Sequence, residues 1–110
     1  MKLIITIVQD EDANTLISTL MGAGYYVTKL ATTGGFLRAG NTTLLLGVED
    51  SKCPSAIEII EKVCRSRTQI ATAPPPIAAG ATGIEMPYPI EVTVGGATVF
   101  VLNIEQFKKF

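Results

Sequence analysis

The residues best suited to binding chemistry lie in one glycine-rich segment, ATTGGFLRAGNTTLLLG, at residues 31–47. Its glycines allow the backbone to approach a ligand closely and to offer amide donors to an anion. Phe36 supplies a face on which a base can stack, an interaction that contributes about 1 to 3 kcal/mol per base. Asn41 and Thr28 add side-chain donors and acceptors for a base edge or a phosphate oxygen. The segment therefore suits a nucleotide that is held without being transformed.

The same segment also has a purely structural interpretation. A neighbouring subunit would bury Phe36 and Leu37, and the glycines would do no more than form a turn. Composition and spacing do not decide between this interpretation and nucleotide binding.

Several kinds of enzyme lack a required residue in this chain. There is no histidine, so the usual hydrolase triads, histidine-based acid-base catalysis and most metal sites are excluded. Gly35 and Gly40 have the spacing of a phosphate-binding P-loop, but Asn41 stands where that motif has lysine, and a strand rather than a helix follows. The acidic residues 10–12 fit the capped first turn of a helix better than a metal site. We expect neither an enzyme nor a metal or cofactor.

The bulk composition indicates one cytoplasmic domain over residues 1–110. The net charge of -1 gives no basic face for a nucleic acid polymer or an anionic membrane, and no signal peptide or membrane span is visible. The two cysteines, Cys53 and Cys64, match no zinc spacing and are expected to be reduced core thiols. Lys108 and Lys109 are interpreted as solvated charges.

The elements that must position the binding residues follow the order βαββα, and a β-hairpin follows a long loop. Continuous apolar runs predict the strands, and three-and-four spacing of apolar residues predicts the helices. The expected elements are a strand over 2–8, a helix that is capped by Asp10 or Asp12 and stopped by Gly22 and Gly24, paired strands over 25–33 and 42–49, a helix from 51 to 67, an irregular loop over 71–89, and a hairpin that turns at Gly95 and Gly96.

This order is typical of an α+β fold with the split βαβ arrangement of ferredoxin-like domains. Right-handed connections place both helices on one face of the sheet and leave the other face uncovered. Together with the high apolar content of the chain, the uncovered face predicts a homo-oligomer.

Long stretches of the chain resemble the PII-like cyclic di-AMP receptors (PstA proteins) of Gram-positive bacteria. The resemblance rests on KLIITIVQDED, TKLATTGGFLRAGNTTLLLGV, PYP and EVTVGGATVFVLNIEQF. It implies a PII-like homotrimer of ferredoxin-like subunits that binds cyclic di-AMP in the clefts between neighbours. It further implies a non-enzymatic second-messenger receptor whose loops at 34–40 and 68–89 change conformation and inform a downstream protein that the sequence does not name.

The resemblance also assigns residues to the two sides of the ligand. Thr28, Asn41 and the backbone at Gly47 are implied to read one adenine. Tyr26 is included near a phosphate, at a position where the resemblance implies a basic or polar residue.

Four further residues are implied to enclose the ligand. Gly35, Phe36 and Leu37 would cover the nucleotide, and Phe100 would close the pocket from its apolar side. The main alternative is a PII-type sensor of ATP or another adenine nucleotide, which would need basic residues near the phosphates, where the glycine-rich segment offers only Arg38.

Overall fold

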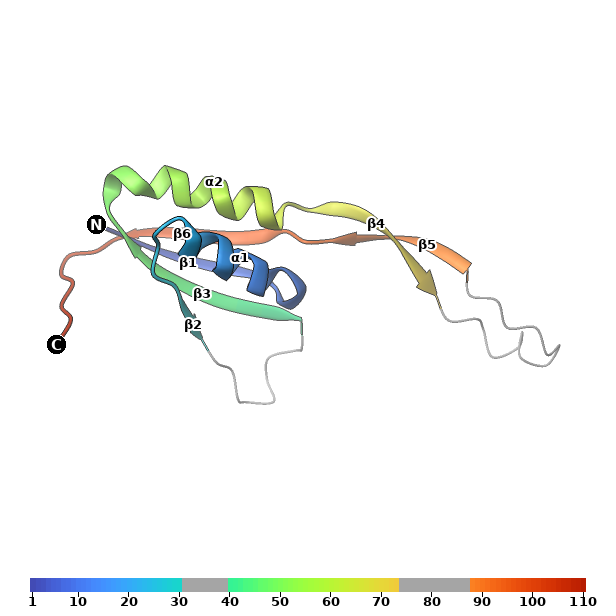
Figure 1. Cartoon of the computed structure of the whole chain (residues 1–110), viewed down its shortest axis with the longest axis horizontal. Helices are drawn as coiled ribbons and strands as arrows, with labels where there is room; N and C mark the ends of the chain where they lie inside the picture. Colours follow the sequence, from blue (N-terminus) through green and yellow to red (C-terminus); the bar gives the residue numbers. More distant parts are fainter. Residues whose placement is uncertain (31–39, 74–87) are drawn as a thin grey trace.

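A computed structural model of the chain describes residues 1–30, 40–73 and 88–110. The molecule measures 65 by 30 by 20 Å. It is elongated because a two-stranded arm projects from a body made of two helices and a four-stranded sheet (Figure 1).

The sheet of the body is antiparallel throughout and has the strand order β2-β3-β1-β6. Its strands are β1 (Lys2–Gln9), β2 (Thr28–Leu30), β3 (Asn41–Val48) and β6 (Ala97–Asn103). The helical elements are α1 (Asp10–Gly22), the short 3-10 helix η1 (Asp50–Lys52) and α2 (Cys53–Cys64). Because β3 lies between β1 and β2, and β1 lies between β3 and β6, the connectivity is the predicted split βαβ arrangement of an α+β fold.

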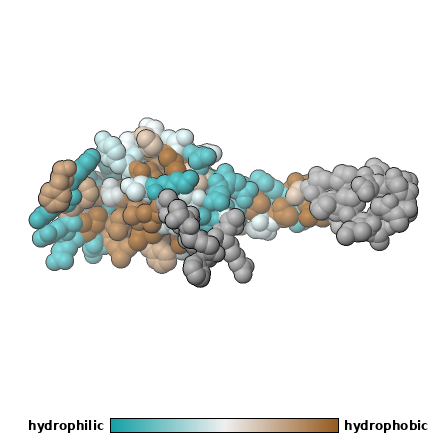
Figure 2. Space-filling view, turned by 90° about the horizontal axis from the view of Figure 1, so that it is seen from below, coloured by the Kyte–Doolittle hydropathy of each residue, from teal (hydrophilic) through white to brown (hydrophobic). Residues whose placement is uncertain are grey.

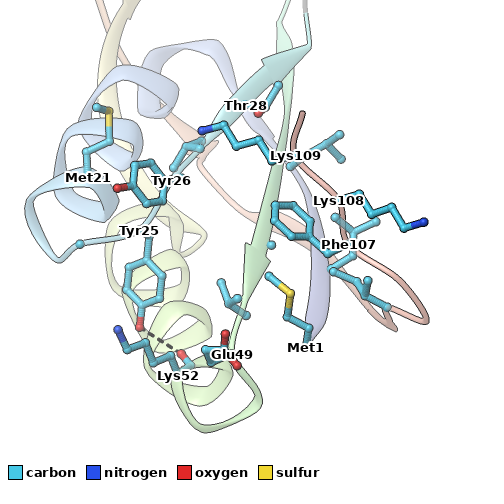
Figure 3. A pocket seen from close by; sticks show the side chains of 17 residues that line it. Met1, Met21, Tyr25, Tyr26, Thr28, Glu49, Lys52, Phe107, Lys108 and Lys109 are labelled. Carbon is cyan, nitrogen blue, oxygen red and sulfur yellow. Dashed lines mark hydrogen bonds between the residues drawn. The ribbon is translucent and has the colours of Figure 1, made fainter.

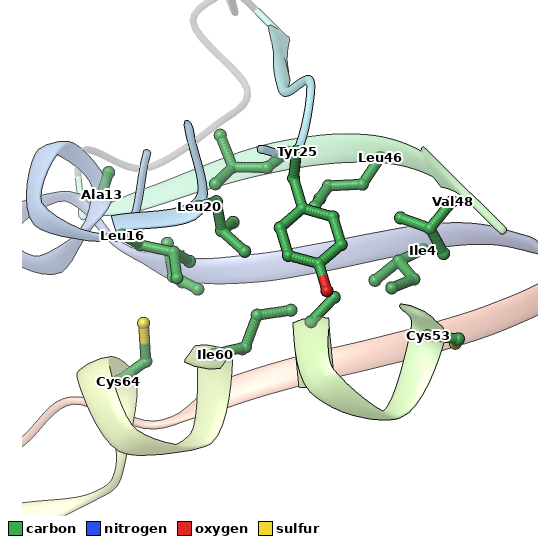
Figure 4. Packing of buried hydrophobic residues seen from close by; sticks show 13 residues of the cluster. Ile4, Ala13, Leu16, Leu20, Tyr25, Leu46, Val48, Cys53, Ile60 and Cys64 are labelled. Carbon is green, nitrogen blue, oxygen red and sulfur yellow. The ribbon is translucent and has the colours of Figure 1, made fainter. Parts of the chain in front are cut away.

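Both helices pack against one face of this sheet (Figures 1 and 4). Side chains alternate between the faces of a strand, so Ile4 and Val8 of β1 are buried on the helix side beside Leu44 and Leu46 of β3. The helices contribute the facing apolar residues, and Tyr25 donates a hydrogen bond to the Lys52 carbonyl over 3.0 Å. These contacts form the single core cluster found in the described residues.

The predicted buried cysteines are confirmed. Cys53 and Cys64 are free thiols in this core. Burial is the main cause and the nearby carboxylate of Asp12 a second cause that together raise the pKa of Cys64 to about 11, so the thiol is protonated and unreactive at neutral pH.

In the described residues, the opposite face of the sheet carries no helix, as the sequence predicted. Phe100 and Leu102 of β6 remain about half exposed there, at 51% and 47%, and they lie directly opposite Ile5 and Leu3 of β1. We call this the open face. Figure 2 shows hydrophobic residues gathered on one side of the body.

The predicted hairpin at Gly95 and Gly96 is wrong. β5 (Tyr88–Val94) pairs with β4 (Arg67–Ala73) to form the arm, whereas β6 pairs with β1 in the body. Both glycines have positive φ, 83° and 93°, and they link two sheets. A Gly-Gly pair specifies a change of backbone direction, but it does not specify which strand the next segment joins.

The strand β4 was also missed. The helix expected to reach residue 67 ends at Cys64, and residues 71–73, 88 and 89 of the expected irregular loop belong to the arm's two strands. The arm strands pair only with each other in the described residues, so little burial pattern marks them in the sequence. The rest of that loop, residues 74–87, lies outside the described part of the chain.

Candidate functional site

Thr28 and Phe100, two of the predicted ligand residues, lie in one row across the open face. The register pairs Thr28 with Leu45, Leu45 with Ile5, and Ile5 with Phe100. The row crosses all four strands, so Thr28 and Phe100 are about 14 Å apart at an inter-strand spacing of about 4.8 Å. One chain therefore places them at opposite ends of the open face, out of reach of a common adenine.

Tyr26, Thr28 and Gly47 come together in a cavity of about 880 Å³ beside β2 and the end of β3 (Figure 3). Gly47 lies two residues beyond the register partner of Thr28, a diagonal neighbour at about 7 to 8 Å. Tyr26 precedes β2 and is 88% exposed, so its ring is free to contact a ligand. The structure thus brings together three of the residues that the sequence indicated.

The same cavity is lined by residues that the sequence analysis did not select. Phe107, Lys108 and Lys109 come from the C-terminal segment, which follows β6 and is attached to the start of β1 by a hydrogen bond from the Ile104 amide to the Met1 carbonyl over 3.1 Å (Figure 3). The lysines were interpreted as solvated charges, and no local pattern distinguishes them from such charges.

These lysines give the cavity a positive balance. Lys52, Lys108 and Lys109 line it together with one acid, Glu49. An aromatic or apolar group with an attached anion would match that combination.

Asn41 stands apart from this cavity. It begins β3 on the open face, six residues from Gly47, and at about 3.4 Å per residue this separates them by about 20 Å. Asn41 instead lines a second hollow of about 390 Å³ together with Gln9 and Gly95. Asn41 and Gly47 of one chain therefore cannot contact the same adenine.

The start of β3 is held by the first residue of α1. Asp10 accepts hydrogen bonds from the Gly40 amide over 3.1 Å and from the Thr42 hydroxyl over 2.5 Å, and its own amide donates to the Gly40 carbonyl over 2.9 Å. The expectation that Asp10 or Asp12 caps the helix is wrong, because Gln9 occupies the cap position without a side-chain bond and the carboxylate of Asp10 binds the neighbouring strand.

The remaining predicted contacts, Gly35, Phe36 and Leu37, lie outside the described residues. Their proposed position over the nucleotide stays a prediction.

Comparison with known proteins identifies the family of the chain. The model of the family described as "Cyclic-di-AMP receptor" matches residues 1–110. The chain belongs to the cyclic-di-AMP receptor family. A solved structure, described as a functionally unknown protein from Pediococcus pentosaceus ATCC 25745, is 44% identical with a TM-score of 0.77, and the match covers 99% of this chain and 96% of that one.

A receptor of this family is a non-enzymatic binding protein, and the site has the matching chemistry. Among the described residues, no cluster of three or more His, Cys, Asp or Glu side chains is arranged to hold a metal ion. The cavity beside β2 combines hydroxyl groups, aromatic rings and ammonium groups, which suit the recognition of a base and a phosphate. No helix in the described segments is long and apolar enough to cross a membrane.

Proposed function

We propose that this receptor binds cyclic di-AMP in clefts between neighbouring copies of the chain, which assemble as a homotrimer through their open faces. One observation carries the proposal. Thr28 and Phe100 lie at opposite ends of one row, about 14 Å apart, so a single adenine base that contacts both must take them from two chains.

The separation of Asn41 from Gly47 supports the same arrangement. Both residues lie on the open face of β3 but at opposite ends of the strand. If a neighbouring chain supplies one of them, the two can contact one adenine, and each cleft then contains the full set of contacts.

The apolar character of the open face supplies the reason to assemble. Phe100 and Leu102 are about half exposed, and burying such surface contributes about 25 cal/mol per Å². Closed cyclic symmetry is the usual outcome when one chain presents two complementary patches.

The binding energy is consistent with a second-messenger receptor. Stacking of one adenine contributes about 2 kcal/mol, and each charge-assisted hydrogen bond about 1.5 to 3 kcal/mol. After the cost of association, these contributions and the burial of the ligand leave about -8 kcal/mol, which corresponds to a micromolar Kd.

The proposal is tested by light scattering and isothermal titration of the purified protein. Three chains of 11.7 kDa predict a particle of about 35 kDa. Cyclic di-AMP is expected to bind at one molecule per chain, and ATP and cyclic di-GMP are expected to give no comparable heat. A monomeric mass, or binding of ATP in place of cyclic di-AMP, would contradict the proposal, and the second result would favour a PII-type sensor of ATP.

A pair of variants localises the ligand. Asn41→Ala is expected to weaken cyclic di-AMP binding at least tenfold, because an adenine group then loses its partner. Asn14→Ala, an exposed asparagine on α1, is the matched control and should leave the affinity unchanged. Equal affinities in the two variants would remove Asn41 from the site.

A further inference from the structure

Four consecutive residues, Gln9 to Asp12, join the end of β1 to the first turn of α1 and contact two distant parts of the chain. We call this segment the β1–α1 junction. Asp10 binds Gly40 and Thr42 on either side of Asn41, as described above. The junction therefore fixes the backbone from which a proposed ligand residue projects.

The other contacts of the junction reach the root of the arm. Gln9 Oε1 accepts a hydrogen bond from the Gly95 amide over 2.7 Å, directly after β5. Asp12 forms an ion pair with Arg67, the first residue of β4, with Oδ1 to Nη2 at 2.8 Å and Oδ2 to Nη1 at 3.3 Å. Both strands of the arm are thus attached to the same short segment.

The geometry of the ion pair makes this attachment specific. Asp12 is 8% exposed and Arg67 is 33% exposed at their side chains, so the two-point contact is shielded from water on the carboxylate side. Hydrogen bonding to Asp12 raises the pKa of Arg67, which keeps the guanidinium charged at every physiological pH. A buried carboxylate that lost this partner would be left uncompensated, so the pair favours one position of β4.

The register completes the connection from the ligand side. Gln9 and Asn41 are direct cross-strand partners, so both project on the open face. The same hollow of about 390 Å³ is lined by Gln9, Asn41 and Gly95. Asn41 therefore lies beside the residue whose side chain holds the Gly95 amide.

We propose that the β1–α1 junction transmits occupancy of the ligand site at Asn41 to the β4–β5 arm. This regulation rests on the proposed cyclic di-AMP binding. Ligand contact at Asn41 shifts the start of β3, Gln9 and Asp10 follow it, and the bonds to Gly95 and Arg67 redirect the root of the arm. Because coupling between two binding events is reciprocal, a partner that immobilises the arm changes the affinity for cyclic di-AMP by the same factor.

Hydrogen exchange of the arm strands tests the proposal. Amide exchange of residues 67–73 and 88–94 is measured with and without saturating cyclic di-AMP in the full chain. The wild-type arm is expected to change its exchange rates about threefold or more on binding. Asp12→Asn is expected to lose that response while isothermal titration still detects cyclic di-AMP binding within about threefold of wild type. Gln9→Ala is expected to lose the response as well.

Controls separate a broken connection from a damaged fold. Gln69→Ala makes the same substitution on the exposed surface of β4 and should keep the wild-type response. Slow exchange of the amides of β1 and β3 in each variant shows that the body is folded. Asp12→Asn keeps the shape of the side chain, so it provides a second test if Gln9→Ala does not fold.

The outcomes also distinguish this inference from the proposed function. Wild-type protein that gives no heat with cyclic di-AMP would refute ligand binding and the coupling together. Wild-type protein that binds cyclic di-AMP without any change in the arm would refute the coupling alone. An arm response that persists in both Gln9→Ala and Asp12→Asn would show that the signal travels by another route.

Discussion

Mixing two inactive variants tests whether the binding site is shared between chains. Phe100→Ala removes the apolar wall of the proposed cleft, and Thr28→Glu places a carboxylate where an anionic ligand would bind. If each cleft takes Thr28 from one chain and Phe100 from its neighbour, the first variant still offers an intact Thr28 and the second an intact Phe100. A mixed oligomer then contains clefts in which both residues are native.

The magnitudes follow from the exposure of Phe100 and from the statistics of assembly. A phenylalanine side chain presents about 200 Å², and since Phe100 is 51% exposed, about 100 Å² remain for the ligand and neighbour to bury. At about 25 cal/mol per Å² its loss costs about 2.5 kcal/mol, or roughly 60-fold in affinity. Random assembly of equal amounts of the two variants restores both native residues in about one quarter of the clefts of a closed ring.

The assay is isothermal titration of co-expressed variants that carry different tags and are purified through both. Each variant alone should bind cyclic di-AMP weakly, whereas the mixture should show about 0.25 sites per chain or more at wild-type affinity. Lys29→Glu and Val101→Ala are the matched controls, because each neighbours one tested residue but lies on the helix side of the sheet, opposite Leu44 or Ile4. Mixed oligomers that recover no wild-type sites would refute the shared cleft.

Three further predictions concern the root of the arm, the core and the cavity. Gly95→Ala should destabilise the protein by about 1 to 3 kcal/mol in denaturant titration, because its Cβ would stand 2.5 Å from the Arg65 carbonyl oxygen at a φ of 83°. Gly96→Ala, with φ of 93° but no atom within 4 Å of its Cβ, isolates the cost of the backbone conformation, and equal losses in the two variants would contradict the steric argument. The pKa of Cys64 is raised from 9.0 to about 11, so the folded state holds the thiol proton more tightly than the unfolded state does. This contribution to stability is roughly 2 to 3 kcal/mol, is fully present below pH 9 and is lost as the pH rises from 9 to 11. Cys64→Ala should therefore show a shallower decline in the free energy of unfolding over that range, and parallel curves would show that the thiol does not titrate as described. Lys109→Gln should weaken cyclic di-AMP binding about fivefold and reduce the salt dependence of binding, because the cavity loses an ammonium group. Lys29→Gln, on the helix side of the sheet, should leave the affinity unchanged. Equal titration curves for the two variants would show that Lys109 does not contact the ligand.

The sequence by itself determined the class of the body. The continuous isoleucine-rich run of β1 predicted a strand in the middle of a sheet, and the spacing of apolar residues predicted α1 and α2 because burial on one side of a helix imposes a period of 3.6 residues. The right-handed connections between these elements predicted that one face of the sheet would be uncovered. The resemblance of long stretches to the cyclic di-AMP receptors predicted the family, which the family model confirms.

Only the tertiary structure decided which strands pair and which side chains share a cavity. Gly95 and Gly96 looked like a hairpin turn, yet the strands they join belong to different sheets, because pairing depends on partners at least 15 residues away. Lys109 is exposed, as its interpretation as a solvated charge predicted, but only the tertiary structure shows that the C-terminal segment places it at the cavity beside β2. Local sequence specifies the conformation of a segment, whereas tertiary packing specifies which distant segments lie beside it. The binding site of this receptor is formed by segments that are distant in the sequence, so only the tertiary structure shows which residues line it.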